Sequence, residues 1–305
     1  MFRSIFMHTD ALSDILKWLR LKAEVYLHTD FQGCWAVDTS GSRSVPFHLV
    51  HSGRSWLHLQ DEAPRLLSAG DLVIFPHDAQ HYLSSESHCP NAELVDQTMA
   101  QLGAPAQGEV TGLTCGHFMF ENKADWPLLD SLPAVIVLEL SDTSRLGNTR
   151  ALLQLLIAEL EEQGAGASLA VDYLAHVLFI HILRSQLEKG LPSGLLKALF
   201  SPQVGKALTL IHADIAKPWT LASLASAVGM SRAVFAAEFK SLTGKTAIAY
   251  LSEWRMLTAA ELLQTTDLTL FDISERCGYQ SEAAFRKAFK HVTGKTPGEV
   301  RRAAD

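Results

Sequence analysis

The stretch SRAVFAAEFKSLTGKT, residues 231–246, returns fifty residues later as SEAAFRKAFKHVTGKT, residues 281–296. Nine of the sixteen positions are identical, among them both phenylalanines and the closing Thr-Gly-Lys-Thr. Low-complexity sequence does not produce such agreement, so the C-terminal part contains an internal repeat. The segments that precede the two copies also match, because each predicts a short helix that ends at Gly229 or Gly278 and leads through a tight turn to a second helix.

A helix, a short glycine turn and a capped second helix are typical of the helix-turn-helix, in which the second helix enters the major groove of DNA. Ser231 and Ser281 are placed to cap the second helices. The phenylalanines, spaced i and i+4, form the buried stripe of each. The opposite faces then present the predicted DNA contacts, which are Arg232, Ala233, Ala236, Ala237 and Lys240 in the first copy and Ser281, Glu282, Ala283, Arg286, Lys287 and Lys290 in the second.

The segment between the copies, AIAYLSEWRMLTAAELLQTT, predicts one helix of about twenty residues, ~30 Å long at ~1.5 Å per residue. This length is close to the ~34 Å between successive major grooves on one face of a duplex. A helical repeat or a protein-binding bundle would share the buried phenylalanines, but it would not need the doubled glycine turn and serine cap at a spacing that fits DNA. The pattern therefore favours a DNA-binding domain.

The last hundred residues resemble the double helix-turn-helix domain of the AraC/XylS transcription regulators. The resemblance rests on VGMSRAVFAAEFKSLTGKT, YLSEWRMLTAAELL and CGYQSEAAFRKAFKHVTGKTPGEVRR. It implies a sequence-specific regulator, either an activator or a repressor, with promoter DNA and RNA polymerase as partners. It also implies that Arg255 is the arginine of the linking helix and that Pro297 closes the second unit. Ser274 and Cys277 depart from the usual small apolar residues of that unit.

Composition and charge place these helices in a larger soluble protein. Of 305 residues, 48% are apolar and 19% charged, which suits two folded domains and excludes a disordered or fibrous chain. The net charge of −7 hides an asymmetry: residues 1–203 carry 13 basic and 23 acidic side chains, or −10, whereas residues 204–305 carry 13 and 10, or +3. No uninterrupted apolar run reaches the ~18 residues of a membrane span, and the first residues do not resemble a signal peptide. With four scattered cysteines and no C-x-x-C pair, we expect a reduced, cytoplasmic protein.

Three segments follow from the texture of the chain. Short apolar runs between Gly, Pro, Asp and Ser predict an all-β barrel or sandwich, the sensor domain of residues 1–145. Two helical patterns joined by GAGA predict an antiparallel hairpin, assigned with its flanks to residues 146–200 as linker and dimerisation element. Residues 201–305 form the all-α DNA-binding domain, so the fold class is multi-domain α+β. The apolar runs VLFIHILRSQL and LLQLLIAEL exceed what a small barrel face buries, which predicts a homodimer.

The first segment resembles the cupins, so its expected fold is a cupin-like β-barrel. GDLVIFPHDAQH, residues 70–81, has the spacing of the second cupin motif, and PFHLVHSGRSWLHL resembles the end of the first. LTCGHF and WPLLDSLPAVIVLEL resemble the cupin-like sensor that precedes the DNA-binding unit in one AraC branch. Of the metal-ligand positions that the resemblance implies, His81 keeps a ligand, and the others fall on Ser40, Ser42 and Pro46.

The candidate sensor pocket consists of His48, His81, Cys34 and Cys115. Strand alternation directs His48 to the interior. Imidazole and thiolate are preferred ligands of Zn²⁺, so a zinc site formed by His48, His81 and Cys34 is one hypothesis. The other is that the histidines hydrogen-bond to backbone or to a small effector while the cysteines pack as small hydrophobes. Four further histidines lack ligand spacing and are expected on the surface: His8, His28, His58 and His88.

Three functions are open at this point. The preferred interpretation is a regulator, not an enzyme, whose first domain senses a small molecule. A variant is a redox switch in which an oxidant attacks Cys34, Cys89 or Cys115. The alternative is a metal-dependent cupin dioxygenase or isomerase with an accessory domain, which the lost ligands disfavour because such chemistry needs a filled coordination sphere with an open position.

Overall fold

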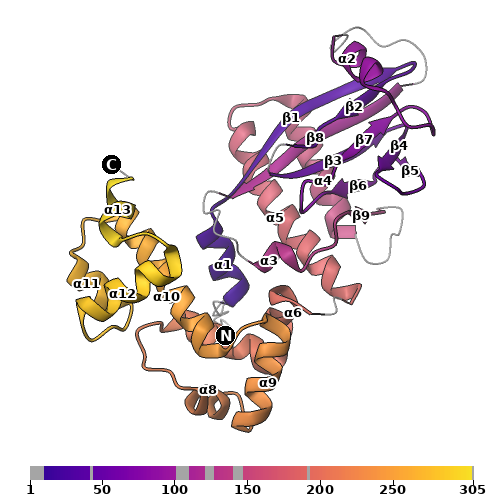
Figure 1. The fold of residues 1–305 in the computed structure, drawn as a ribbon. Coiled ribbons are helices and arrows are strands. Elements are labelled where there is room, and N and C mark those ends of the chain that lie inside the picture. The colour runs from indigo at the N-terminus through magenta and orange to yellow at the C-terminus, as the bar shows by residue number, and fades with distance from the viewer. Residues whose placement is uncertain are drawn as a thin grey trace, which may run out of the picture. The chain divides into compact units, whose positions relative to one another are not determined.

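The computed structural model describes residues 10–41, 44–100, 110–120, 127–139, 147–190 and 193–303. The chain divides into two compact units (Figure 1). One unit spans Lys17–Leu191 and contains the strands together with the helical hairpin. The other combines Pro192–Asp305 with Met1–Leu16. The division therefore groups the predicted hairpin segment, up to residue 191, with the sensor rather than treating it as a separate linker.

The first unit is a β-sandwich of two antiparallel sheets. One sheet has the order β1-β8-β3-β6-β9 and the other the order β2-β7-β4-β5, so the strands form two open sheets rather than one closed barrel. Its strands are β1 (Leu21–Gln32), β2 (Ala36–Asp38), β3 (Val45–Ser52), β4 (Arg54–Leu59), β5 (Arg65–Ser68), β6 (Leu72–Ile74), β7 (His81–Ser84), β8 (Val110–Phe120) and β9 (Ile136–Leu138). The short helices α2 (Ala92–Ala100) and α3 (Pro127–Asp130) accompany them, whereas the boundary between the two units falls within α1 (Ala11–Leu19).

Strand alternation decides which side chains fill the sandwich. Along β3, His48 and Val50 point between the sheets, whereas Phe47 and Leu49 point to the outer face. The interior cluster contains Val50 together with Leu57, Leu83 and Leu113 of three other strands. The predicted all-β region and the predicted inward orientation of His48 are both confirmed.

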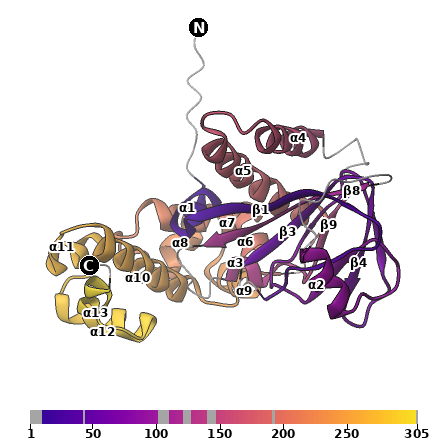
Figure 2. The same ribbon diagram turned by 90° about the horizontal axis from the view of Figure 1, so that it is seen from above.

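Two long helices, α4 (Gly147–Glu162) and α5 (Ala167–Glu188), form the predicted antiparallel hairpin on the outer face of the five-stranded sheet (Figure 2). Phe179 of α5 packs on the sheet, with its ring 5.1 Å from that of Phe118. By length and composition, α5 is the one helix in the described ranges that is apolar enough to cross a membrane. It leaves an exposed apolar stripe of Leu169, Tyr173 and Val177, spaced four residues apart.

The second unit is all-helical and repeats itself. Its helices are α6 (Leu195–Phe200), α7 (Pro202–Ala213), α8 (Leu221–Ala227), α9 (Arg232–Thr243), α10 (Ala247–Thr265), α11 (Leu270–Arg276), α12 (Glu282–Thr293) and α13 (Pro297–Arg302). Ser231 caps α9 and Ser281 caps α12, each through its hydroxyl. Gly229 and Gly278 take the left-handed conformation, with φ of 74° in both. The predicted helix-turn-helix pairs and the predicted linking helix, α10, are therefore confirmed.

The repeated Thr-Gly-Lys-Thr has a structural reason. In the first copy the Thr243 hydroxyl donates to the Phe239 carbonyl at 2.8 Å and accepts from the Lys245 amide at 3.2 Å, which closes α9. Gly244 then turns the chain with φ of 74°. The last threonine, Thr246, caps the next helix. The second copy repeats these contacts, so the motif ends one helix and starts another.

Candidate functional site

The first predicted reading helix, α9, buries Phe235 and Phe239 completely and exposes its opposite side. Of the residues predicted to contact DNA, Ala236 is half-buried and the other four are exposed: Arg232, Ala233, Ala237 and Lys240. Val234 was not among the predicted contacts, yet its side chain is also exposed. A helical projection centred on the two phenylalanines would have found it, because Val234 lies 100° from Phe235 on the exposed side. The exposed face of α9 is thus mostly apolar and small.

The second predicted reading helix, α12, has the same buried pair, Phe285 and Phe289, but a different exposed side. Glu282 is half-buried, and the other predicted contacts are exposed: Ser281, Ala283, Arg286, Lys287 and Lys290. Ala284 and His291 are also exposed and were missed. Exposure is what a DNA contact requires, and α12 carries the cationic donors Arg286 and Lys287 at the two positions where α9 carries Ala236 and Ala237.

One of these cations is already engaged. The Arg286 Nε and Nη2 atoms donate to the same Glu282 carboxylate oxygen, at 2.8 and 2.6 Å. This pair, spaced i and i+4, directs the guanidinium along the helix surface. In the part of the chain that the structure describes, no ion pair includes Lys287 or Lys290, so their ammonium groups are available to phosphate or to guanine.

In the sandwich, the structure brings the two predicted histidines together. Their Nε2 atoms are 2.9 Å apart, and the Thr39 hydroxyl lies 3.0 Å from each. The His81 Nδ1 atom lies 2.7 Å from the Ala79 carbonyl, so it carries a proton and donates, which leaves the His81 Nε2 atom to accept. Phe75 stacks on His81 with ring centroids 3.6 Å apart. Burial lowers the pKa of both histidines, so the pair is neutral.

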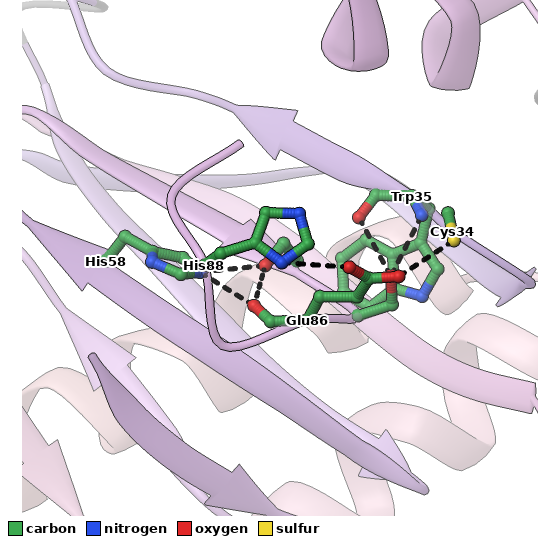
Figure 3. A network of polar contacts seen from close by, with 7 residues as sticks. Cys34, Trp35, His58, Glu86 and His88 are labelled. Carbon is green, nitrogen blue, oxygen red and sulfur yellow. Dashed lines mark hydrogen bonds and ion pairs between the residues drawn. The ribbon is translucent and has the colours of Figure 1, made fainter. Parts of the chain in front are cut away.

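The two predicted cysteines lie in different environments. Cys115 is on β8, paired in register with His48, and is fully buried, and burial raises the pKa of its thiol. Cys34 is exposed and does not join the histidines, which corrects the prediction. Its thiol donates to the Glu86 carboxylate at 2.9 Å, and the same carboxylate contacts the His88 Nδ1 atom at 2.9 Å (Figure 3). The hydrogen bond to Glu86 and its negative charge raise the pKa of the Cys34 thiol.

The surface expectation for the remaining histidines holds for one and fails for another. His88 is exposed, with 71% of its side chain accessible. His58 is buried, because the chain segment after β7 covers it and its Nε2 atom contacts Ser84 Oγ at 2.8 Å and the Glu86 carbonyl at 3.1 Å (Figure 3). His28 is half-buried, with its Nδ1 atom 2.8 Å from Thr114 Oγ1. His8 lies outside the described residues.

The donor set does not fit a cupin metal. Pro46 has no donor side chain, Ser40 hydrogen-bonds to Asp38, and Ser42 lies outside the described residues. The Nε2 atoms of the histidine pair are directed at each other and at a hydroxyl. Across the described ranges, no three His, Cys, Asp or Glu side chains converge as a metal requires. The hypothesis of zinc at His48, His81 and Cys34 is therefore not supported.

Two polar neighbours of the histidine pair were missed. Tyr26 is the extra residue of a bulge in β1, between Val25 and Leu27. Its hydroxyl contacts Thr39, whose own hydroxyl contacts both histidines. Neither residue carries a motif, and a bulge leaves no mark in the apolar alternation, so the sequence held no signal for them.

A cavity of about 720 Å³ opens between the edge strands of the two sheets, β5 and β9. Its floor is apolar, with Leu59 and Val137 packed on the interior cluster. Arg65 of β5 and Glu139 after β9 form an ion pair of 2.5 Å across it, and the Lys189 ammonium donates to the Val137 carbonyl at 3.2 Å. The volume suits a small organic molecule. No sequence pattern indicated this cavity, because its walls come from segments as far apart in the chain as Leu57 and Lys189.

Comparison with known proteins agrees with this architecture. Residues 10–188 match the family described as Cupin, and residues 224–303 match the family described as Helix-turn-helix domain. An AraC-like transcription regulator of Streptomyces lividans is 32% identical over 302 residues, 96% of this chain and 98% of its own. The HTH-type transcriptional regulator AlkR of Acinetobacter baylyi is 31% identical, over 96% of this chain and 99% of its own.

This chain belongs to the AraC family of transcription regulators. Its relatives are transcription regulators and not enzymes, which contradicts the alternative of a cupin dioxygenase or isomerase. The helix-turn-helix region makes DNA the partner of this AraC-family protein. A solved complex of the AdpA DNA-binding domain with a target DNA is 30% identical over 34% of this chain and 92% of that chain, with a TM-score of 0.32.

Proposed function

We propose that this AraC-family regulator reads promoter DNA with α9 and α12 and that a small, largely apolar effector in the cavity between β5 and β9 controls it. The observation that carries the sensor half is the cavity itself: about 720 Å³, with an apolar floor and a charged rim. The buried histidine pair is less suited to contact an effector directly, because its side chains are closed off from solvent and already bonded to each other.

The position of the cavity suits control of DNA binding. One wall is the end of α5, with Ser185 and Gln186, and the chain passes from there to the DNA-binding unit at residue 192. An effector changes promoter affinity only if it binds two states of the protein unequally. A ligand that separates Arg65 from Glu139 and displaces Lys189 from the Val137 carbonyl would change how the end of α5 is held against β9.

A redox signal is the weaker interpretation. A trigger cysteine needs a thiolate that is both accessible and favoured at neutral pH. Burial raises the pKa of Cys115, and Glu86 raises that of Cys34. We therefore expect a Cys34→Ser variant to keep the transcriptional response. Cys89 is also exposed and is tested separately by Cys89→Ser, and loss of the response in either variant would favour an oxidant.

The effector proposal is tested with full-length protein and three naphthalene probes that share one apolar body: 2-naphthol, 2-naphthoate and 2-naphthylmethylamine. DNA is a duplex selected by the protein from a random library. We expect at least one probe to raise the unfolding temperature and to change DNA affinity. Ala63→Trp, which fills the cavity, should abolish both effects, whereas Ala92→Trp, on exposed α2, should not. Effects that survive Ala63→Trp would place the effector elsewhere.

The histidine pair is proposed to support the sensor rather than to bind the effector. His48 on β3 and His81 on β7 join one sheet to the other through their Nε2 atoms. We expect His48→Ala or His81→Ala to change the transcriptional response and to leave DNA affinity without effector nearly intact. Unchanged induction in both variants would remove the pair from the sensing mechanism.

We further propose a homodimer formed through α5. Leu169, Tyr173 and Val177 form an apolar stripe along this helix, and a second copy of the chain provides a complementary surface. Sedimentation at tens of micromolar should show a dimer that Tyr173→Glu dissociates and Ala92→Glu does not. As a dimeric activator in the cytoplasm, the protein would contact RNA polymerase at its promoters.

A further inference from the structure

One side chain of the linking helix contacts both helix-turn-helix units. The Arg255 Nε atom donates to the Ile215 carbonyl at 2.7 Å, and its Nη2 atom donates to the Lys217 carbonyl at 2.9 Å. Both carbonyls belong to the segment between α7 and α8, which leads into the first helix-turn-helix unit. The same guanidinium lies over the ring of Tyr279, 5.7 Å from its centroid, in the turn of the second unit.

The turn of the second unit approaches this segment closely at Gly278. A Cβ atom at that position would lie 2.5 Å from the Ala216 carbonyl oxygen and 2.7 Å from Arg255 Nη2. The equivalent glycine of the first unit, Gly229, has the same φ of 74°, but nothing lies within 4 Å of its Cβ position. Both glycines provide the left-handed backbone conformation that the turn needs, but only at Gly278 do neighbouring atoms leave no room for a side chain.

The contacted segment is itself held in place. The Asp214 carboxylate accepts from the Lys217 amide at 3.0 Å, and the Asp214 carbonyl accepts from Trp219 Nε1 at 3.0 Å. The Lys217 ammonium lies 4.0 Å above the Trp219 ring. Ile215 packs against the hydrophobic core of the second unit, which includes Phe285. The segment that leads into the first helix-turn-helix unit therefore also packs against the core of the second helix-turn-helix unit.

We infer that Arg255 is a positioning residue that fixes the second helix-turn-helix unit against the first, so that α9 and α12 accept only operators with one spacing between their half-sites. Without this clamp, the helix α10 and the apolar contact at Ile215 still join the units, but they allow more relative rotation. An arginine is required, since its planar fork donates to two carbonyls two residues apart, which a single ammonium does not reproduce. Arg255 acts through position and not through DNA contact.

The test measures DNA affinity of the full chain as a function of operator spacing. The probe is a duplex that the wild-type protein selects from a random library, with its two contacted segments mapped by footprinting. Variants of the probe gain or lose one or two base pairs between these segments. Each inserted pair rotates one half-site by about 34° relative to the other. No effector is added, so the result does not depend on the cavity proposal.

We expect the wild type to lose about 10-fold or more in affinity on a two-base-pair change, comparable to mismatched sites. Arg255→Ala should bind the parent duplex about 10-fold more weakly and lose no more than about 3-fold further on altered spacing. Arg255→Lys keeps the charge and should show the same loss of spacing preference. The salt dependence of binding should not change in either variant, because no phosphate contact is removed.

The two glycines supply a matched control. Gly278→Ala and Gly229→Ala carry the same backbone strain at φ 74°, but only Gly278→Ala disturbs the clamp. We expect Gly278→Ala to lose spacing preference and Gly229→Ala to keep it. The inference would be overturned if Arg255→Ala and Arg255→Lys bound more weakly than the wild type by the same factor at every spacing. It would also be overturned if the two glycine variants had the same spacing preference. Hydrogen exchange of α12 amides identifies a variant whose second helix-turn-helix unit has unfolded. If Arg255→Ala is such a variant, the spacing preference of Arg255→Lys tests the inference in its place.

Discussion

The two helix-turn-helix units have the same frame and different surfaces. What they share builds the fold: the serine hydroxyls that cap α9 and α12, the buried phenylalanine pairs and the hydrogen bonds of the Thr-Gly-Lys-Thr closures recur in both. What they do not share lies on the exposed sides, where α9 presents Val234 and Ala237 and α12 presents Ala284 and Lys287 at the matching positions. We therefore expect the exposed positions that differ between the copies to be those at which the two helices read DNA differently.

The units also differ in how their helices are capped. The capping box before α8 pairs Thr220 with Ser223, whereas the one before α11 pairs Thr269 with Asp272. At the closing threonines, Thr296 forms a box with Glu299, while Thr246 faces Ala249, which has no polar side chain. Carboxylates thus complete the caps at the starts of α11 and α13, whereas the matching caps of α8 and α10 use none.

The largest expected effect comes from emptying one core and not the other. Phe235→Ala and Phe285→Ala should each cost about 3–5 kcal/mol of local stability, since both rings are fully buried. We expect hydrogen exchange of the full chain to show lost protection in α9 for the first variant and in α12 for the second. Equal loss of protection in α9 and α12 from either variant would show that the two helix-turn-helix units unfold together and are not independently stable.

The next effect concerns the reading faces. Lys287→Ala should weaken operator binding by about 1–3 kcal/mol, or roughly 5- to 150-fold, whether it reads a base or a phosphate. Ala237→Ser, at an exposed position of α9, should change it by less than about 3-fold. Titrations on one selected operator at fixed salt measure both. Small, equal losses would make α9 the main reader and reverse the assignment.

A smaller effect tests the Glu282–Arg286 pair. Glu282→Gln removes a negative charge near the DNA backbone and frees the Arg286 guanidinium, so we expect affinity for all duplexes to rise by about 2- to 3-fold. Arg286→Ala should lower it. A loss in Glu282→Gln confined to operators with one particular base pair would instead show that Glu282 accepts from a cytosine amino group.

The smallest effect is a difference in acid sensitivity between the units. The Thr296 amide and hydroxyl donate to the Glu299 carboxylate at 2.6 and 2.8 Å and lower its pKa. A lowered pKa in the folded state means that this cap stabilises α13 above the usual glutamate pKa and is lost as the pH falls through the lowered value. Between about pH 5 and 3, amides at the start of α13 should lose protection before those at the start of α10. Glu299→Gln should abolish the difference, and its persistence in that variant would assign the effect to another group.

The parts predicted well from sequence are those set by short-range physics. The two helix pairs of the all-helical unit follow from apolar spacing, serine caps and glycine turns within about fifteen residues, so they could be predicted without tertiary contacts. The inward face of β3 followed from alternation, which placed His48 correctly. The exposed faces of α9 and α12 followed from the phenylalanine stripes, with the omissions of Val234, Ala284 and His291.

The parts that failed or were missed depend on which distant segments meet. Cys34 contacts Glu86, 52 residues away, and not the histidines, because the strand order of the four-stranded sheet places it there. The cavity between β5 and β9 exists because two sheets leave their edges side by side.

The repeated frame of the all-helical unit, its capped helices and its buried faces could be read without tertiary contacts, since spacing along one helix or strand sets them. Packing between distant segments sets the contact of Arg255 and Gly278 with the segment before α8, and the contact of His48 with His81 beside Thr39. These contacts join residues about 9 to 62 positions apart, and nothing in a local pattern specifies such pairings, because they form only when separately folded elements pack.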